Sequence, residues 1–353
     1  MKQHDLMDIP EGVFCSSRKK YGFLFNPFAW RVAFEAASKT RASDQLRALR
    51  AEIFQGTVAC VQAGRYGLQA AASESEVLIP NTLLEGRTEF FDVPEALPPQ
   101  SHARVTQFSV IGADCLEVAE TLKKSGLNPC VLNLSNRQNP GGGVLHGAGA
   151  QEENLFRRSN LFLSLYPFAS YAAQYGLAKH EKSYPLDRNT GGIYSGSVTV
   201  FRGSEQNGYR LLRHPFQVAF VSVAAMNRPE LVAEADEWRV VETLIEPIRR
   251  KIRTILRLAG KYQHNALVLS AFGCGAFRNP PRHIAELFRE VFAEPEFQNY
   301  FELVVFAILE DHNSYKEHNP QGNLLPFSEV FDALATPENS EDTRPLISSH
   351  RSW

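Results

Sequence analysis

Two adjacent carboxylates, Glu152 and Glu153, directly follow a cluster of glycines near the middle of the chain. The segment reads NPGGGVLHGAGAQEENLFRRSNLF, and its glycines are Gly141, Gly142, Gly143, Gly147 and Gly149. Glycines allow positive φ angles and let main-chain N–H groups approach an anion, and the N-terminus of a following helix adds a favourable partial charge. Because the cluster stands between a predicted buried strand and a predicted helix, we expect an anion site for a phosphate-bearing ligand. A flexible surface loop is the alternative.

The two glutamates are candidates for acid chemistry at this turn. Consecutive side chains on a helix diverge by roughly 100°, so Glu152 and Glu153 do not flank one bond from opposite sides as conventional glycosidase carboxylates do at ~5 to 9 Å. We therefore expect a division of roles, in which one glutamate acts as a general acid toward a scissile oxygen while its neighbour orients a hydroxyl or a water. The alternative is that both carboxylates only stabilise the first turn of the helix through its macrodipole.

Two common nucleotide-binding motifs do not fit the glycine cluster. In GxGxxG the sixth position is a glycine, but here it is His146 when counted from Gly141 and Glu152 when counted from Gly147. The P-loop pattern GxxxxGK[ST] does not occur in the sequence. Dinucleotide-dependent redox enzymes and P-loop nucleotide hydrolases are therefore disfavoured.

A second glycine loop, GCGAFRNPP, follows the predicted strand ALVLSAF. Two glycine loops at neighbouring strand ends can hold the two phosphates of a diphosphate, because ligands of open α/β sheets bind beyond the carboxyl ends of the strands. The aromatic ring in this loop can pack on a sugar or base, or can fill space between loop and helix. The candidate ligand-binding residues of the loop are Gly273, Cys274, Gly275, Ala276 and Phe277.

A third polar loop, AAMNRPE, follows the predicted strand FQVAFVSV. Its Asn227 is a further candidate for a ligand contact, with a plain polar turn as the alternative.

Short apolar runs rich in β-branched residues alternate with helical patterns after residue 100, which predicts a three-layer α/β/α domain with a mixed, largely parallel central sheet. We expect an N-terminal helical accessory region at 1–100, the main domain at 101–335 and a disordered tail at 336–353. Strands are predicted at 104–111, 130–135, 198–202, 216–223, 266–272 and 303–309. Helices are predicted at 43–63, 114–124, 151–163, 236–259 and 281–292. Ser43 would cap the first of these helices and Gly64 would end it. Pro247 would kink or divide the helix at 236–259.

Composition places the chain among globular proteins. It has 353 residues, 44% hydrophobic and 22% charged, with a formal net charge of -2, so no overall field favours nucleic acid or an acidic membrane surface. The five cysteines are scattered without zinc-ligand spacing, which indicates reduced thiols and no structural metal. No apolar run has the length of a signal peptide or a membrane span, so we expect a cytoplasmic protein.

The segment from Asn139 to Phe162 resembles the signature of the microbial-type poly(ADP-ribose) glycohydrolases, in which a glycine triplet is followed, seven residues on, by Gln-Glu-Glu. The similarity extends to VLNLSN, SAFGCGAFRNPP and VVFAILED, and covers roughly 104–311, with a weaker likeness around the predicted helix at 43–63. Two matching loops at these spacings make the resemblance specific.

The resemblance implies a macrodomain fold that binds ADP-ribose and hydrolyses the ribose–ribose O-glycosidic bond of poly(ADP-ribose) without metal or cofactor. It implies that Glu153 protonates the leaving oxygen and then activates water, and that Glu152 holds the ribose hydroxyls. The family's distal-ribose asparagine would be Asn136, favoured over Asn139 because it directly ends the strand. The remaining implied contacts are Gln151, the glycine triplet, and the Gly273–Phe277 loop on the diphosphate, with Phe277 packed on the terminal ribose.

The implied partners are poly(ADP-ribose) or ADP-ribosylated protein, with ADP-ribose as product; we expect a monomer that binds no membrane and no nucleic acid directly. Two other functions fit the same loops: a mono-ADP-ribosyl hydrolase acting on protein or nucleic acid, and an ADP-ribose reader that does not cleave. The retained glutamate pair argues against the reader. The sequence departs from the family in having Leu134 and Ser135 where Phe and Ala are more usual, and in the AAMNRPE loop.

Overall fold

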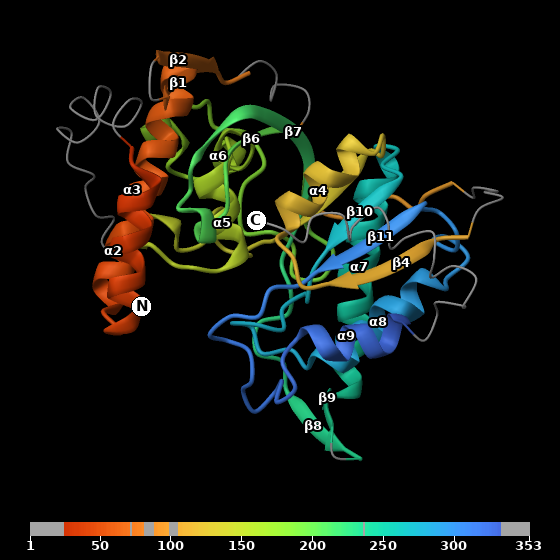
Figure 1. The fold of residues 1–353 in the computed structure, drawn as a ribbon. Helices are drawn as coiled ribbons and strands as arrows, with labels where there is room; N and C mark the ends of the chain where they lie inside the picture. The colour runs from red at the N-terminus through yellow and green to blue at the C-terminus, as the bar shows by residue number, and fades with distance from the viewer. Residues whose placement is uncertain (1–24, 71–72, 81–87, 99–104, 236, 333–353) are drawn as a thin grey trace.

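A seven-stranded mixed sheet forms the centre of the computed structural model, which describes residues 25–70, 73–80, 88–98, 105–235 and 237–332 (Figure 1). The strand order is β3-β6-β7-β5-β10-β11-β4. These strands are β3 (Thr88–Phe91), β4 (Gln107–Ile111), β5 (Pro129–Leu134), β6 (Gly192–Arg202), β7 (Leu211–Val223), β10 (Ala266–Leu269) and β11 (Leu303–Ala307). The five strands from β7 to β4 in this order run parallel to one another, whereas β6 is antiparallel to both β7 and β3. The predicted mixed, largely parallel sheet is confirmed.

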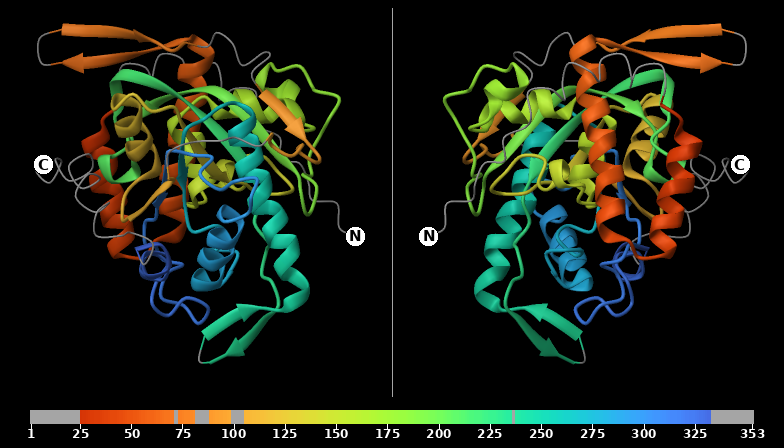
Figure 2. Two further views of the ribbon diagram at one scale, coloured as in Figure 1. Left: turned by 90° about the vertical axis from the view of Figure 1, so that its right-hand side faces the viewer. Right: turned by 90° about the vertical axis from the view of Figure 1, so that its left-hand side faces the viewer.

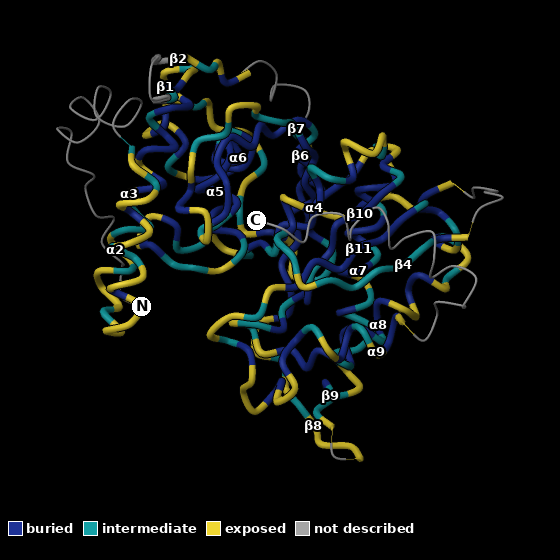
Figure 3. The backbone as a smooth tube through the Cα atoms, viewed as in Figure 1, coloured by how far each residue is buried: buried dark blue, intermediate teal, exposed yellow. Residues whose placement is uncertain are grey.

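Helices cover both faces of this sheet, and the alternation of side chains along the strands explains why. On β10, Leu267 and Leu269 lie in one core cluster with the helices that follow residue 240, while Ala266 and Val268 lie in the other with the helices between residues 43 and 165. Each fully buried aliphatic side chain of this kind contributes ~1.5–3 kcal/mol. The helices are α3 (Ser43–Ala63), α4 (Cys115–Lys124), α5 (Gln151–Arg158), α6 (Leu161–Leu165), α7 (Glu242–Lys261), α8 (Pro281–Phe292) and α9 (Leu324–Asp332). The predicted three-layer architecture is confirmed, with the buried residues concentrated at the sheet (Figure 3).

The N-terminal region contains helix α2 (Pro27–Lys39) as well as the predicted α3. Helix α3 ends at Gly64, which has a φ of +69° as expected, but Ala42 rather than Ser43 occupies its N-cap. The sequence did not predict the following hairpin of β1 (Arg65–Ala70) and β2 (Ser73–Leu78), nor strand β3. Because β3 pairs with β6, residues before 101 complete one edge of the central sheet.

Two predicted helices differ from the observed ones. The helix expected at 151–163 is interrupted because Asn160 exchanges main-chain and side-chain hydrogen bonds with Thr199 of β6, which places an extended residue, Ser159, between α5 and α6. The helix expected at 236–259 begins only at Glu242, after a hairpin of β8 (Leu231–Glu234) and β9 (Glu237–Val240). Pro247 lies inside α7 without dividing it. The β1–β2 and β8–β9 hairpins project from opposite ends of the molecule (Figure 2).

Short 3₁₀ helices and cysteines complete the description. The 3₁₀ helices are η1 (Val144–His146), η2 (Tyr166–Phe168), η3 (Ala172–Tyr175) and η4 (Glu205–Asn207). Cys60, Cys115, Cys130 and Cys274 are buried free thiols, and Cys15 lies outside the described residues, as does the predicted tail at 336–353. In the described ranges, every helix is too short or too polar to cross a lipid bilayer.

Candidate active site

The first glycine cluster forms a tight turn between the end of β5 and the start of α5. Gly141 and Gly142 have φ angles of +77° and +52°, which favour glycine. A Cβ atom on Gly141 would lie 2.7 Å from the ring of Phe156, and one on Gly142 would lie 2.5 Å from Oε1 of Glu153. Glycine is therefore required for this backbone to lie against the first turn of α5.

Glu152 is held at the end of β5 by four donors. Its Oε1 accepts hydrogen bonds from Ser135 Oγ at 3.0 Å, Gly141 N at 3.1 Å and Asn133 Nδ2 at 3.4 Å, and its Oε2 accepts one from Asn136 N at 2.7 Å. The side chain is only 3% exposed. The carboxylate is thus fixed in position by uncharged groups.

Glu153 is anchored through one oxygen only. Its Oε1 accepts a hydrogen bond from Gly143 N at 2.9 Å. Its Oε2 is buried and has no hydrogen-bond partner among the described residues. A buried carboxylate oxygen with free lone pairs is oriented by its partner atom and remains available to a substrate hydroxyl or glycosidic oxygen.

The surroundings alter the acidity of Glu152. Burial and, to a smaller extent, the negative charge of Glu153 raise the pKa of Glu152 to about 8, although the hydrogen bonds from Asn136, Gly141 and Ser135 act to lower it. On α5 itself, the ring of Phe156 packs against that of Tyr166 with a centroid distance of 5.6 Å, and Tyr166 packs in turn against Tyr171 and Tyr175. With its raised pKa, Glu152 holds its proton at pH values where an ordinary glutamate is ionised.

A cavity of about 540 Å³ opens at the carboxyl ends of β4, β5, β10 and β11. Its lining includes the start of α5 and the second glycine loop, namely Gly149, Ala150, Gln151, Gly273, Gly275, Ala276 and Phe277. The position agrees with the rule that open parallel sheets bind ligands beyond their strand ends.

The second glycine loop is braced from two directions. Gly273 has a φ of +77°, and its carbonyl accepts a hydrogen bond from Asn279 Nδ2 at 3.0 Å. The carbonyl of Cys274 lies 2.8 Å from His318 Nε2. The Cys274 side chain itself is fully buried and outside the cavity lining, and burial raises the pKa of its thiol. The loop therefore offers its main chain and Phe277, not a thiolate, to the cavity.

Comparison with known proteins agrees with this arrangement. Residues 55–203 match the family described as microbial-type PARG, catalytic domain. The poly(ADP-ribose) glycohydrolase of Thermomonospora curvata is 30% identical, with 81% of this chain and 100% of that chain covered and a TM-score of 0.63. The chain belongs to the microbial-type poly(ADP-ribose) glycohydrolase family. The resemblance that the sequence showed, and the macrodomain-like fold that it implied, are confirmed.

Further members of this glycohydrolase family have been solved with ligands. The T. curvata glycohydrolase bound to the inhibitor ADP-HPD is 29% identical, covers 82% of this chain and 100% of that one, and has a TM-score of 0.61. The Deinococcus radiodurans glycohydrolase in complex with ADP-ribose is 27% identical, covers 72% and 97%, and has a TM-score of 0.53. No curated protein matches the chain.

Several residues that the sequence nominated as ligand contacts of the glycohydrolase have structural partners. Gln151 bridges to β5, with its Oε1 accepting from Leu134 N at 2.8 Å and its Nε2 donating to Leu132 O at 2.7 Å. Asn136 Oδ1 accepts from the main-chain N–H groups of Gln138 and Asn139, at 2.8 and 3.1 Å. These bonds set the angle at which α5 and the glycine turn leave the strand.

The structure does not bring all nominated residues into one space. Asn227 is exposed after β7 and does not line the cavity, and neither do Asn139 and the glycine triplet. Glu152 and Glu153 also lie outside the lining, although Gln151 and Asn154 of the same helix are part of it. Because residues three apart share a helix face, the cavity and the glutamates occupy adjoining faces of α5.

Two contributors to the glutamate site were missed from sequence. Asn133 and Ser135 are buried polar residues that bind Glu152. The sequence could have indicated them, because Asn133 and Ser135 are polar residues at alternate positions of an otherwise apolar strand and therefore face the same side of the sheet. The cavity wall also contains carboxylates that the sequence did not single out: Asp114, Glu117, Glu205, Glu310 and Asp311.

Proposed function

We propose that this chain hydrolyses the ribose–ribose O-glycosidic bond of poly(ADP-ribose) without a metal ion and releases ADP-ribose, with Glu153 as general acid and base. The observation that carries the proposal is the pair of Glu153 oxygens: Oε1 is fixed by Gly143 N, and Oε2 is buried without a partner among the described residues. That buried oxygen is oriented by its partner atom for a proton transfer to or from a substrate.

The reaction proceeds in two proton transfers. The Glu153 carboxyl gives its proton to the bridging oxygen as the bond from the anomeric carbon to that oxygen breaks, which leaves an oxocarbenium-like sugar and a free hydroxyl on the departing ribose. Water then adds to the anomeric carbon and returns a proton to Glu153. The carboxylate is restored to its starting state, so no co-reactant other than water is consumed.

Glu152 serves the same step in a different way. Three donors occupy its Oε1, but only Asn136 N is bonded to Oε2, which leaves room for one hydroxyl of the ribose. The burial that raises its pKa to about 8 also limits the negative charge of the pair. Glu152 therefore orients the sugar while Glu153 transfers the proton.

The strand order supports an extended placement of the ligand. From β5 to β4 the order is β5-β10-β11-β4, which spans ~14 Å at the usual strand spacing. We place the terminal ribose at the glutamates after β5, the diphosphate on the Gly273–Phe277 loop after β10, and the adenosine toward β11 and β4. Phe277 is half-buried in the cavity wall, where its ring can pack on the ribose next to the diphosphate.

The test compares substrates on the purified protein. Wild-type chain is incubated with poly(ADP-ribose) and separately with mono-ADP-ribosylated protein, and free ADP-ribose is quantified alongside the affinity for ADP-ribose. We expect release from the polymer, its loss in Glu153→Gln, and unchanged ADP-ribose affinity in that variant. Release only from the mono-modified protein would favour a mono-ADP-ribosyl hydrolase, and binding without release from either substrate would favour a reader; each would overturn the proposal.

A further inference from the structure

Helix α3 of the N-terminal region lies directly against the turn that leads into α5. A Cβ atom on Gly147 would lie 1.9 Å from the carbonyl oxygen of Arg47, and Gly147 has a φ of +66°. A Cβ atom on Gly149 would lie 2.6 Å from Nη1 of Arg50. Glycine is therefore required at 147 by the main chain of α3, and Gly149 leaves room for the Arg50 guanidinium, whereas the first two glycines are required by α5.

Arg50 connects this turn to the cavity wall. Its guanidinium donates two hydrogen bonds to Glu205, from Nε to Oε2 and from Nη2 to Oε1, both at 2.8 Å. Glu205 and Gly149 both line the cavity. The guanidinium also lies 5.0 Å from the centroid of the Phe34 ring, so this side chain of α3 contacts α2 as well.

The hydrogen bonds continue from Glu205 back to α5. Tyr209 donates its hydroxyl to Glu205 at 2.9 Å and accepts from Arg157 Nε at 2.8 Å and Asn154 Nδ2 at 3.1 Å, which saturates the hydroxyl. Arg157 then donates from Nη1 to the carbonyl of Ala148 at 2.8 Å. The path starts at α3 and ends on the same turn that α3 contacts.

We propose that Arg50 is a positioning residue for the glycohydrolase reaction, holding the turn at 147–150, and with it the two glutamates, through Glu205, Tyr209 and Arg157. The inference rests on the proposed function. Burial opposes the charge on Arg50, but hydrogen bonding and attraction from Glu205, with smaller contributions from Tyr209 and Glu153, keep its pKa raised. A permanently charged, bidentate donor gives the turn one fixed orientation.

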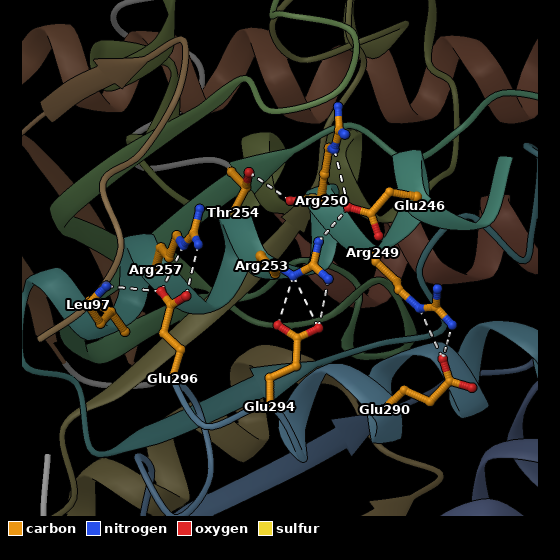
Figure 4. A network of polar contacts seen from close by, with 10 residues as sticks. All are labelled: Leu97, Glu246, Arg249, Arg250, Arg253, Thr254, Arg257, Glu290, Glu294 and Glu296. Carbon is orange, nitrogen blue, oxygen red and sulfur yellow. Dashed lines mark hydrogen bonds and ion pairs between the residues drawn. The ribbon is translucent and has the colours of Figure 1, made fainter. Parts of the chain in front are cut away.

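A matched control exists on the opposite face of the sheet (Figure 4). Arg257 of α7 binds Glu296 with the same two contacts, both 2.8 Å, and Glu296 accepts a third hydrogen bond from Leu97 N at 2.9 Å. The side-chain exposures are 24% and 18% there, against 18% and 23% for Arg50 and Glu205. Neither Arg257 nor Glu296 lines the cavity. Removing Arg257 therefore removes an equivalent ion pair without affecting the turn.

The experiment compares Arg50→Met, Arg50→Lys, Glu205→Gln and Arg257→Met with wild type, at a temperature where all four remain folded. The quantities measured are kcat and KM on poly(ADP-ribose), the affinity for ADP-ribose, and the hydrogen-exchange rates of the amides at 147–153. We expect Arg50→Met and Glu205→Gln to lower kcat by about tenfold or more, with faster exchange at these amides, because misplacement of catalytic groups costs rate. Arg50→Lys should recover part of the rate, and Arg257→Met should keep kcat within about twofold.

An active wild type with Arg50→Met at full kcat would overturn the positioning role, as would an Arg257→Met variant that loses kcat equally. A wild type that releases no ADP-ribose would instead overturn the proposed function.

Discussion

Carboxylates are held in two different ways on the two faces of the central sheet. On one face, three arginines of α7 donate hydrogen bonds to three glutamates that lie in α8 or just after it. The pairs are Arg249 with Glu290, Arg253 with Glu294 and Arg257 with Glu296 (Figure 4). At α5, on the other face, Glu152 and Glu153 accept from main-chain N–H groups and from the side chains of Ser135 and Asn133.

The difference shifts the pKa values of Glu296 and Glu152 in opposite directions. Burial acts to raise the pKa of Glu296, but the hydrogen bonds from Arg257 and Leu97 and the charges of Arg257 and Arg253 lower it below its usual value. Burial raises the pKa of Glu152 to about 8 because neutral donors do not offset desolvation and the charge of Glu153. Arginine pairing thus lowers the pKa of Glu296, whereas burial among uncharged donors beside Glu153 raises that of Glu152.

The largest expected effect comes from Glu153→Gln. The amide keeps the shape of the side chain but cannot transfer a proton, so kcat on poly(ADP-ribose) should fall by ~10²- to 10⁴-fold with little change in ADP-ribose affinity. The matched control on the arginine-paired face is Glu290→Gln, which should leave kcat unchanged. Equal activity of Glu153→Gln and wild type would remove the functional difference between the two faces.

The next effect concerns the glycine that permits main-chain anchoring. Gly142→Ala places a methyl 2.5 Å from Glu153 Oε1 at a φ of +52°, so we expect ~10-fold or greater loss of kcat and ~1–3 kcal/mol of destabilisation. Gly126→Ala is the control, because its φ is +86° but no atom lies within 4 Å of the added carbon. Denaturation and kinetics on both variants separate backbone strain from displacement of the carboxylate. Similar kcat in the two variants would contradict the prediction.

The third expected effect is a pH dependence of opposite sign on the two faces. The folded-state pKa of Glu152 is about 8 against an ordinary 4.5, so the folded chain binds this proton more tightly. That contribution to stability is complete below pH 4.5 and is lost as pH rises through 8, by up to ~1.4 kcal/mol per pH unit. Glu296, with its lowered pKa, contributes stability above its ordinary pKa that is lost as pH falls through the folded-state value.

Calorimetry from about pH 5 to about pH 8, the range over which the Glu152 contribution is lost, tests this sign on wild type and Glu152→Gln. The Tm of wild type should fall relative to that of the variant as pH rises. Parallel Tm curves would show that Glu152 does not titrate across this range.

The smallest expected effect is on the arginine-paired face. Arg253→Met removes contacts with Glu294 and Glu246 that are 21% to 47% exposed, so we expect ~0.5–1.5 kcal/mol of destabilisation, reduced at high salt, and unchanged kcat. Urea denaturation at low and high ionic strength measures it. A loss of kcat here would contradict the assignment of this face to stability alone.

The sequence predicted those elements whose own residues determine them. Helices α4 and α8 and six of the seven strands of the sheet followed from their apolar patterns, because each contains enough apolar residues in its own sequence to indicate a face that packs. The break at Ser159 could not be predicted, because it depends on Asn160 bonding to Thr199, 39 residues away. Strand β3 has only two buried residues, whereas all four residues of the equally short β10 are apolar and buried, so β3 is fixed by its pairing with β6 rather than by its own sequence.

In the candidate site, too, the parts formed by one short segment could be predicted and the parts formed by distant segments could not. The glycine spacing and the glutamates indicated the turn, because the residues that shape it lie within one short segment. Arg50 and Glu205 gave no such signal, since they are 155 residues apart and meet only in the folded chain. Asn227 was nominated from its loop, but its exposed position after β7 depends on how the loop leaves the sheet.

Strand β3 has a practical consequence for any fragment cut at the predicted domain start. A fragment beginning at residue 101 would lack β3 and uncover the main-chain donors and acceptors of β6 that now pair with it, from Gly192 to Ser195. It would also lack Phe54, Val58 and Val61 of α3, which fill one of the two cores. An uncovered strand edge beside newly exposed apolar surface is a template for self-association, so such a fragment is expected to aggregate during expression.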